Sequence, residues 1–253
     1  MGFKRFDPED FVVSADTVTS TVWSGFQPSL NTFFTSSVQK EGTSGPYYLA
    51  VYQTSSIANG AEVQFSIAFG DSTGRGAVQF DSGVPQNTPT KTIYGQYRTL
   101  VLEDENAKFT YGPSFTGSYF YALSVERARY KEKLLPGSLS LGLRLGGRSL
   151  QLTDNSKDVT LPTFYGTQRA FELISGSGGT AYDGNGYAGA GGESSTIGSY
   201  GLFLPDTSTI ILNGAALDDS TYGLQLNTNL GANTDGLNPG KLFSSISTGA
   251  SFT

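Results

Sequence analysis

The side chains of this chain that could most directly do chemistry are its carboxylates. They gather in three short clusters: Glu103-Asp104-Glu105, Asp154 with Asp158, and Asp218-Asp219. Paired carboxylates could hydrolyse a glycosidic bond or bind calcium. Neighbours within one turn seldom face each other across a cleft, and no DxDxDG-type loop is present. Turn formation and helix capping therefore explain these clusters better than catalysis.

Two residue types that carry much enzyme chemistry are missing, because the chain has no cysteine and no histidine. This excludes disulfides, thiolate and imidazole metal ligands, and any Ser-His or Cys-His nucleophile system. Residues 184–189 match the GxGxxG pattern, but no strand precedes them and no helical pattern follows, as a dinucleotide site requires. We expect no enzyme activity and no cofactor.

A row of four cations at period two follows the predicted strand 118–125: Arg127, Arg129, Lys131 and Lys133. If the strand continues past Val125, all four side chains project from one side. They could form a solvated edge that discourages aggregation, a strip that contacts an acidic patch on a neighbouring subunit, or a phosphate-binding strip. The net charge of −6 argues against the last, so no nucleic-acid partner is expected.

Three tyrosines lie in loops rich in glycine and serine: Tyr182, Tyr187 and Tyr200. A tyrosine ring offers a flat apolar face with a polar tip, so it can stack on a sugar or pack on a partner protein. Anchoring of the local fold explains such residues equally well. With the cationic row, these tyrosines are the candidate interface residues.

The elements that must position these side chains are predicted to be β-strands. The chain of 253 residues has 33 glycines, 37% hydrophobic residues, 13% aromatic residues and only 15% charged residues. This composition indicates many tight turns and a packed core. We predict an all-β fold with antiparallel, sandwich-like or jelly-roll-like sheets, long Gly/Ser-rich loops and at most short helical turns.

Runs rich in β-branched, aromatic and other apolar residues, with apolar–polar alternation at 62–70 and 139–152, place the individual strands. Strands are predicted at 47–54, 62–70, 90–102, 118–125, 209–213 and 223–227, with an edge strand at 12–23. Residues 62–70 should be half-buried, and residues 139–152 should form a hairpin around Gly146-Gly147. Helical turns are predicted at 167–173 and 239–246.

The composition changes along the chain and suggests four regions. We predict an N-terminal arm with an edge strand at 1–46, a β core domain at 47–165, a Gly-rich loop or linker at 166–208, and C-terminal strands at 209–253. Nowhere do ~18 consecutive apolar residues occur, so no membrane span is predicted.

Several stretches together resemble a known group of proteins. They are RFDPEDFVVSAD (5–16), PTKTIYGQYRTLVLEDENAKF (89–109), RYKEKLLPGSLSL (129–141) and LTDNSKDVT (152–160), followed by FELISGSGG (171–179) and SYGLFLPD (199–206). In this order they resemble virion structural proteins of contractile-tailed phages that infect cyanobacteria. Similar proteins continue beyond the position of Thr253, so the C-terminal strands are expected to belong to a longer region.

The resemblance implies a non-enzymatic component of the virion, assembled in the host cytoplasm. Its partners would be other virion proteins and copies of itself in a symmetric assembly. A place in the tail or baseplate is expected. The alternatives are a neck-attached, head-attached or fibre-connecting virion protein, and a tail module that binds a receptor or glycan.

Overall fold

The structure is a computed structural model that describes residues 34–37, 48–53, 59–79, 87–130, 132–182, 197–232 and 237–247, the first of these ranges by its backbone alone. The predicted edge strand at 12–23 lies outside the described residues. So do Lys131 and Tyr187, as well as the GxGxxG match at 184–189.

The described elements follow one another in a β-rich order. The strands are β1 (Phe34–Ser37), β2 (Tyr48–Tyr52), β3 (Val63–Asp71), β4 (Thr110–Tyr111), β5 (Phe115–Thr116), β6 (Tyr119–Val125), β7 (Leu141–Leu145), β8 (Arg148–Asp154), β9 (Thr163–Tyr165), β10 (Gln168–Ser177), β11 (Thr180–Ala181), β12 (Gly201–Leu204) and β13 (Thr209–Asn213). The helices are α1 (Pro89–Leu102), α2 (Gly214–Asp218) and α3 (Asn238–Ser247), with a 3₁₀ turn η2 (Arg127–Arg129).

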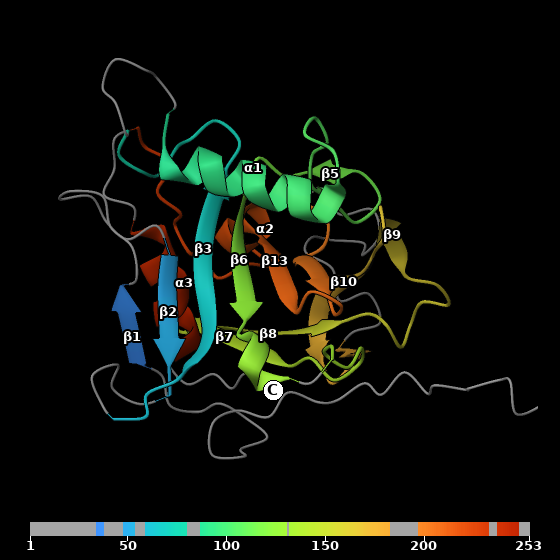
Figure 1. Ribbon diagram of the computed structural model, residues 1–253. Coiled ribbons are helices and arrows are strands. Elements are labelled where there is room, and N and C mark those ends of the chain that lie inside the picture. The colour runs from blue at the N-terminus through green and yellow to red at the C-terminus, as the bar shows by residue number, and fades with distance from the viewer. Residues whose placement is uncertain are drawn as a thin grey trace, which may run out of the picture.

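One curled antiparallel sheet dominates the fold and confirms the all-β prediction (Figure 1). Its 11 strands include a main path in the order β1-β2-β3-β6-β13-β12-β10-β8-β7, and both β9 and β11 pair with β10 off this path. β4 and β5 form a separate hairpin. Strands from the regions predicted as core, linker and C-terminal segment thus share one sheet.

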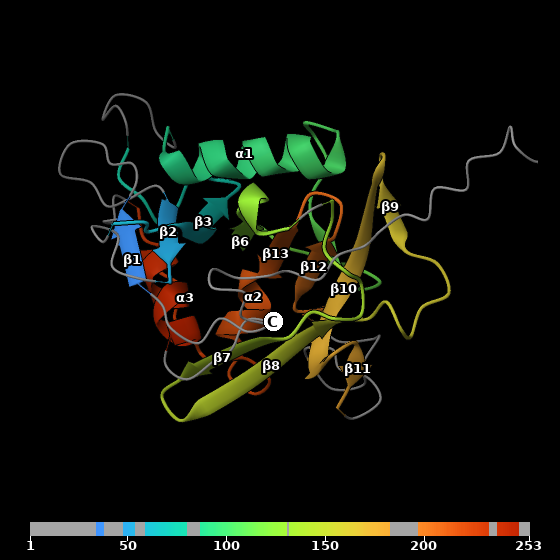
Figure 2. The same ribbon diagram turned by 60° about the horizontal axis from the view of Figure 1, so that its bottom comes forward.

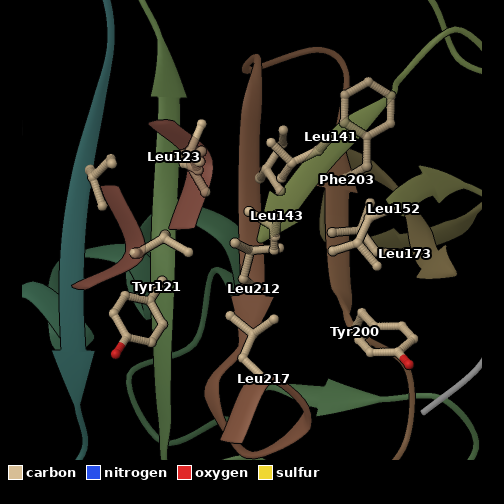
Figure 3. Packing of buried hydrophobic residues seen from close by; sticks show 14 of the residues in the cluster. Tyr121, Leu123, Leu141, Leu143, Leu152, Leu173, Tyr200, Phe203, Leu212 and Leu217 are labelled. Carbon is tan, nitrogen blue, oxygen red and sulfur yellow. The ribbon is translucent and has the colours of Figure 1, made fainter. Parts of the chain in front are cut away.

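The curl gives the sheet an inner face that holds the larger apolar cluster. β7 and β8 pass below the strands from β2 to β13, with α2 and α3 on the same side (Figure 2). Tyr121 and Leu123 from β6, Leu212 from β13 and Leu143 from β7 point into this interior (Figure 3). The β7–β8 end of the sheet therefore faces the central strands β6 and β13 across this apolar interior.

Helix α1 covers the outer face, and this changes the burial expected for β3. Phe65, Ile67 and Phe69 enter the inner cluster as their alternation predicts. The intervening Gln64 and Ala68 are also buried, so the prediction of a half-buried strand is wrong. The second apolar cluster, which includes Ala68 and Tyr94 of α1, lies between that helix and the sheet.

The prediction of a strand at 90–102 is wrong, because these residues form α1, which is also longer than a helical turn. Thr88 caps the helix by accepting a hydrogen bond from the N–H of Lys91, and Pro89 occupies the first turn. Glu103 ends the helix in the left-handed region and donates its N–H to the carbonyl of Thr99. β-branched and aromatic residues suggested a strand, but tertiary packing and capping decide the conformation.

The predicted hairpin at 139–152 is confirmed. β7 and β8 pair from Leu141↔Leu152 to Leu145↔Arg148 around a two-residue turn. Gly146 and Gly147 have φ angles of 55° and 85°, as a type I′ turn requires. The predicted pairing of β2 with β3, the strands β6 and β13, and the helical segment at 239–246 are also confirmed.

Three further predictions need correction. Residues 168–177, expected within a linker that contains a helical turn at 167–173, form the long internal strand β10. Gly201–Leu204, also in the expected linker, form β12. Residues 223–227 form no strand, because the N–H groups of Leu224 and Leu226 both donate to the carbonyl of Leu217 at the end of α2. Among the described residues no helix is long and apolar enough to span a membrane.

Candidate functional site

The three described cations of the row do not project from one strand, because the chain leaves the sheet after Val125. Residues 127–129 form η2, so the predicted one-sided projection of these cations is wrong. Arg127 is exposed and lies over the ring of Tyr130, whereas Arg129 pairs with Glu62 at 2.8 Å. Lys133 is buried. An interface role for each of these residues individually stays a prediction.

The candidate tyrosines also separate. Tyr182 is 63% exposed at the described end of the Gly-rich region. Tyr200 is only 2% exposed, and its hydroxyl donates to the carbonyl of Tyr222 at 2.9 Å. The expectation that Tyr200 is an exposed contact residue is therefore wrong, and the alternative of an anchor for the local fold is confirmed.

Members of the carboxylate clusters accept hydrogen bonds that stabilise the fold. Asp154 is buried and accepts from the N–H of Gly137 at 2.7 Å. Asp218 accepts from the hydroxyl of Tyr119, and Asp219 accepts from two backbone N–H groups of its own turn. In the part of the chain that the structure describes, no group of three or more such side chains could hold a metal ion.

Sequence reasoning missed an exposed apolar arm, residues 156–165, which joins β8 to β10 and contains β9. Leu161 is 78% exposed and Phe164 is 60% exposed. Among the described residues β9 pairs with β10 alone, and it lies at the margin of the sheet (Figures 1 and 2). In this pairing Phe164 stands opposite Arg169. The pair Tyr165↔Gln168 closes a two-residue turn, so in an antiparallel ladder the backbone N–H and C=O of Phe164 point away from β10.

The base of this arm is held firmly. The carboxylate of Glu103 accepts from the backbone N–H and the hydroxyl of Thr167, and the side-chain amide of Gln168 donates to the carbonyl of Leu100. The two hydrogen bonds from Thr167 lower the pKa of Glu103. A fixed base that carries exposed apolar side chains resembles a binding surface more than a disordered loop. The short apolar stretch LPTFY at 161–165, which lies between polar residues, is the feature of the sequence that could have indicated this arm.

Sequence reasoning also missed Glu172, whose chemistry depends on distant residues. Its carboxyl group lies where three segments meet: β10 itself, the turn between β4 and β5, and the chain just before β12. The hydroxyl of Ser199 and the backbone N–H of Gly112 are its hydrogen-bond partners. Burial raises the pKa of Glu172 to about 7, although both hydrogen bonds act in the opposite direction.

Two tyrosines accompany Glu172. Tyr111 is fully buried, and its hydroxyl has no hydrogen-bond partner among the described residues. Tyr165 donates to the carbonyl of Thr110, and burial raises its pKa to about 12, with Glu172 contributing through its negative charge. Neither tyrosine supplies a positive charge to this group.

Comparison of the chain with models of known protein families, with curated proteins and with solved structures gives no match.

Proposed function

We propose that this chain is a non-enzymatic structural protein of a phage particle, in the tail or baseplate, that works through contacts with other subunits. One observation carries the proposal toward a binding role: the arm at 156–165 exposes Leu161 and Phe164 on a fixed base. Large apolar side chains that a chain leaves in water commonly mark protein contacts. The phage assignment rests on the sequence resemblance.

The geometry of the arm supports a specific mode of contact. Phe164 combines an exposed ring with outward-facing backbone groups, so a strand of another subunit could extend the sheet beyond β9. Leu161 would add apolar area at the same margin. In a symmetric particle, many such moderate contacts would act together, each burying about 800 Å² per partner.

The direct test is quantitative mass spectrometry of purified phage particles. We expect this polypeptide at a fixed copy number relative to known tail proteins. A phage protein made early in infection and absent from particles is the control for contamination. Detection of the chain only in the soluble fraction of infected cells would contradict the proposal.

The exposed ring of Tyr182 favours a second candidate function, a tail module that binds a receptor or glycan. This function predicts binding of the isolated protein to host polysaccharide and weaker binding of the variant Tyr182→Ala. Tyr222→Ala, which removes another exposed ring, is the matched control. Equal binding by all three proteins, or none by the unmodified chain, would remove the candidate.

A further inference from the structure

The hydroxyl of Ser199 faces two acceptors with a single proton. Its Oγ contacts Oε2 of Glu172 and lies 3.1 Å from the carbonyl oxygen of Gly201. An ionised carboxylate only accepts hydrogen bonds, so Ser199 could satisfy one of these contacts and not both. A protonated Glu172 donates to Ser199, which then donates to Gly201. The arrangement of the three groups therefore fits a neutral carboxylic acid.

The surroundings of Glu172 also disfavour a charge. In the described part of the chain, no cationic side chain contacts the carboxyl group, whose partners are Ser199 and the N–H of Gly112. The titratable groups around it are Tyr111 from β4 and Tyr165 from β9, and both are neutral at physiological pH. A buried carboxylate without a cation is costly, so the group takes up a proton more readily than in water.

This carboxyl group links two segments that are far apart in the sequence, and it adds to the hydrogen bonds that Asn213 donates to the carbonyls of Ile197 and Ser199. Gly112 lies in the turn of the β4–β5 hairpin, and Ser199 lies two residues before Gly201, where β12 begins. Gly198 brings this chain so close to β4 that a Cβ there would collide with the carbonyl of Tyr111. On the other side, the backbone of Glu172 exchanges two hydrogen bonds with Asn155.

We propose that Glu172 is a protonation latch, which as a neutral acid holds the β4–β5 hairpin and the chain before β12 on the sheet and loosens both when it ionises. The latch is independent of the proposed role in a particle, because it follows from the contacts within one chain. Loss of the proton leaves the Ser199–Gly201 contact without a donor and places an unpaired charge under the hairpin.

The direction of the pH effect follows from the elevated pKa. Between about pH 4.5 and about pH 7 the folded chain binds this proton and the unfolded chain does not. The contribution of the latch is therefore largest at acidic pH and is lost as the pH rises through about 7.

Hydrogen exchange of the full chain tests the latch. Between pH 6 and pH 8, after correction for the intrinsic pH dependence of exchange, we expect opening at Gly112 and at residues 199–201 to increase about tenfold. In Glu172→Gln, whose amide can donate to Ser199 and accept from Gly112 at every pH, the increase should disappear. The exposed Glu105→Gln is the matched control and should behave as the unmodified chain does.

An infrared titration gives a second, independent measurement. The stretching band of a protonated carboxyl group should be present at pH 6, fade by pH 8, and be absent at both values in Glu172→Gln. The proposal is overturned if the unmodified chain shows no pH-dependent opening at these segments, or if Glu172→Gln opens with the same pH dependence. Absence of the band at pH 6 in the unmodified chain would also overturn the proposal. This measurement does not depend on the folding of a variant.

Discussion

Asn155 and Glu172 hold each other through two hydrogen bonds. The N–H of Asn155 donates to the carbonyl of Glu172 at 3.0 Å, and the N–H of Glu172 donates to Oδ1 of Asn155 at 3.0 Å. The last ladder pair between β8 and β10 is Asp154↔Leu173. Asn155 therefore continues the pairing by one residue, with its side chain taking the place of a backbone acceptor.

Replacement of this amide should weaken the fold. Asn155→Ala removes the acceptor and leaves the N–H of Glu172 unsatisfied at a partly buried position. We expect a loss of about 1–3 kcal/mol in the free energy of unfolding, measured by urea denaturation. The exposed Asn106→Ala should change it by less than about 0.5 kcal/mol. An equal effect of both substitutions would contradict this role of Asn155.

The cap of α1 should be sensitive to loss of one hydroxyl. Thr88 accepts from the N–H of Lys91 and donates to the carbonyl of Gly74 at 2.9 Å, so it fixes both the helix start and the loop after β3. Thr88→Ala should cost about 1–2 kcal/mol in thermal or chemical unfolding. Thr88→Ser keeps the hydroxyl and should retain most of the stability. Similar losses in both variants would show that the methyl group, and not the hydroxyl, matters.

Two glycines should respond to alanine with opposite signs. Gly147 has a φ of 85° in the β7–β8 turn, whereas Gly95 lies within α1, and a Cβ at either position meets no atom within 4 Å. Gly147→Ala should destabilise the chain by about 1 kcal/mol through backbone strain alone. Gly95→Ala should stabilise it by about 0.5–1 kcal/mol, because alanine favours the helix. Melting temperatures that move in the same direction would refute this pair of expectations.

The ion pair between Arg169 and Asp206 should contribute to the decrease of the melting temperature at acidic pH. Hydrogen bonds from Arg169 hold the pKa of Asp206 below that of a free aspartate. The folded state thus favours the ionised form, and this stabilisation is present above about pH 4 and lost as the pH falls. Asp206→Asn should flatten the decline of the melting temperature below about pH 4. If the melting temperature of Asp206→Asn decreases at acidic pH as much as that of the unmodified chain, the ion pair does not cause the decrease.

The apolar arm should matter for assembly and not for folding. Leu161→Ser combined with Phe164→Ser alters two side chains that are mostly in water, so the free energy of unfolding should change by less than about 0.5 kcal/mol. Incorporation into particles, measured by mass spectrometry after complementation in infected cells, should fall strongly. The control Thr160→Ser keeps a polar arm residue and should assemble normally. Normal incorporation of the double variant would rule out the arm as a contact.

The local sequence pattern was sufficient wherever neighbours along the chain decide the structure. Alternation in β3, the aromatic and apolar run of β6 and the Gly146-Gly147 turn predicted strands and a hairpin that the structure contains. The same kind of pattern failed at 90–102, because its β-branched and aromatic residues favour a strand, whereas the cap at Thr88 and packing against the sheet make it a helix. The pattern also failed at β10, an internal strand that the composition assigns to a linker because a glycine-rich stretch follows it in the sequence.

The sequence by itself determined the β-rich class, the absence of histidine and cysteine chemistry, and the turns that glycine makes possible. Only the tertiary structure decided that Tyr200 is buried, that the cations near Val125 separate, and that Glu172 meets Ser199 and Gly112. The physical reason is that burial and the pKa of a side chain depend on partners from distant parts of the chain. The spacing of residues along the sequence does not show which distant segments lie next to each other in the curled sheet.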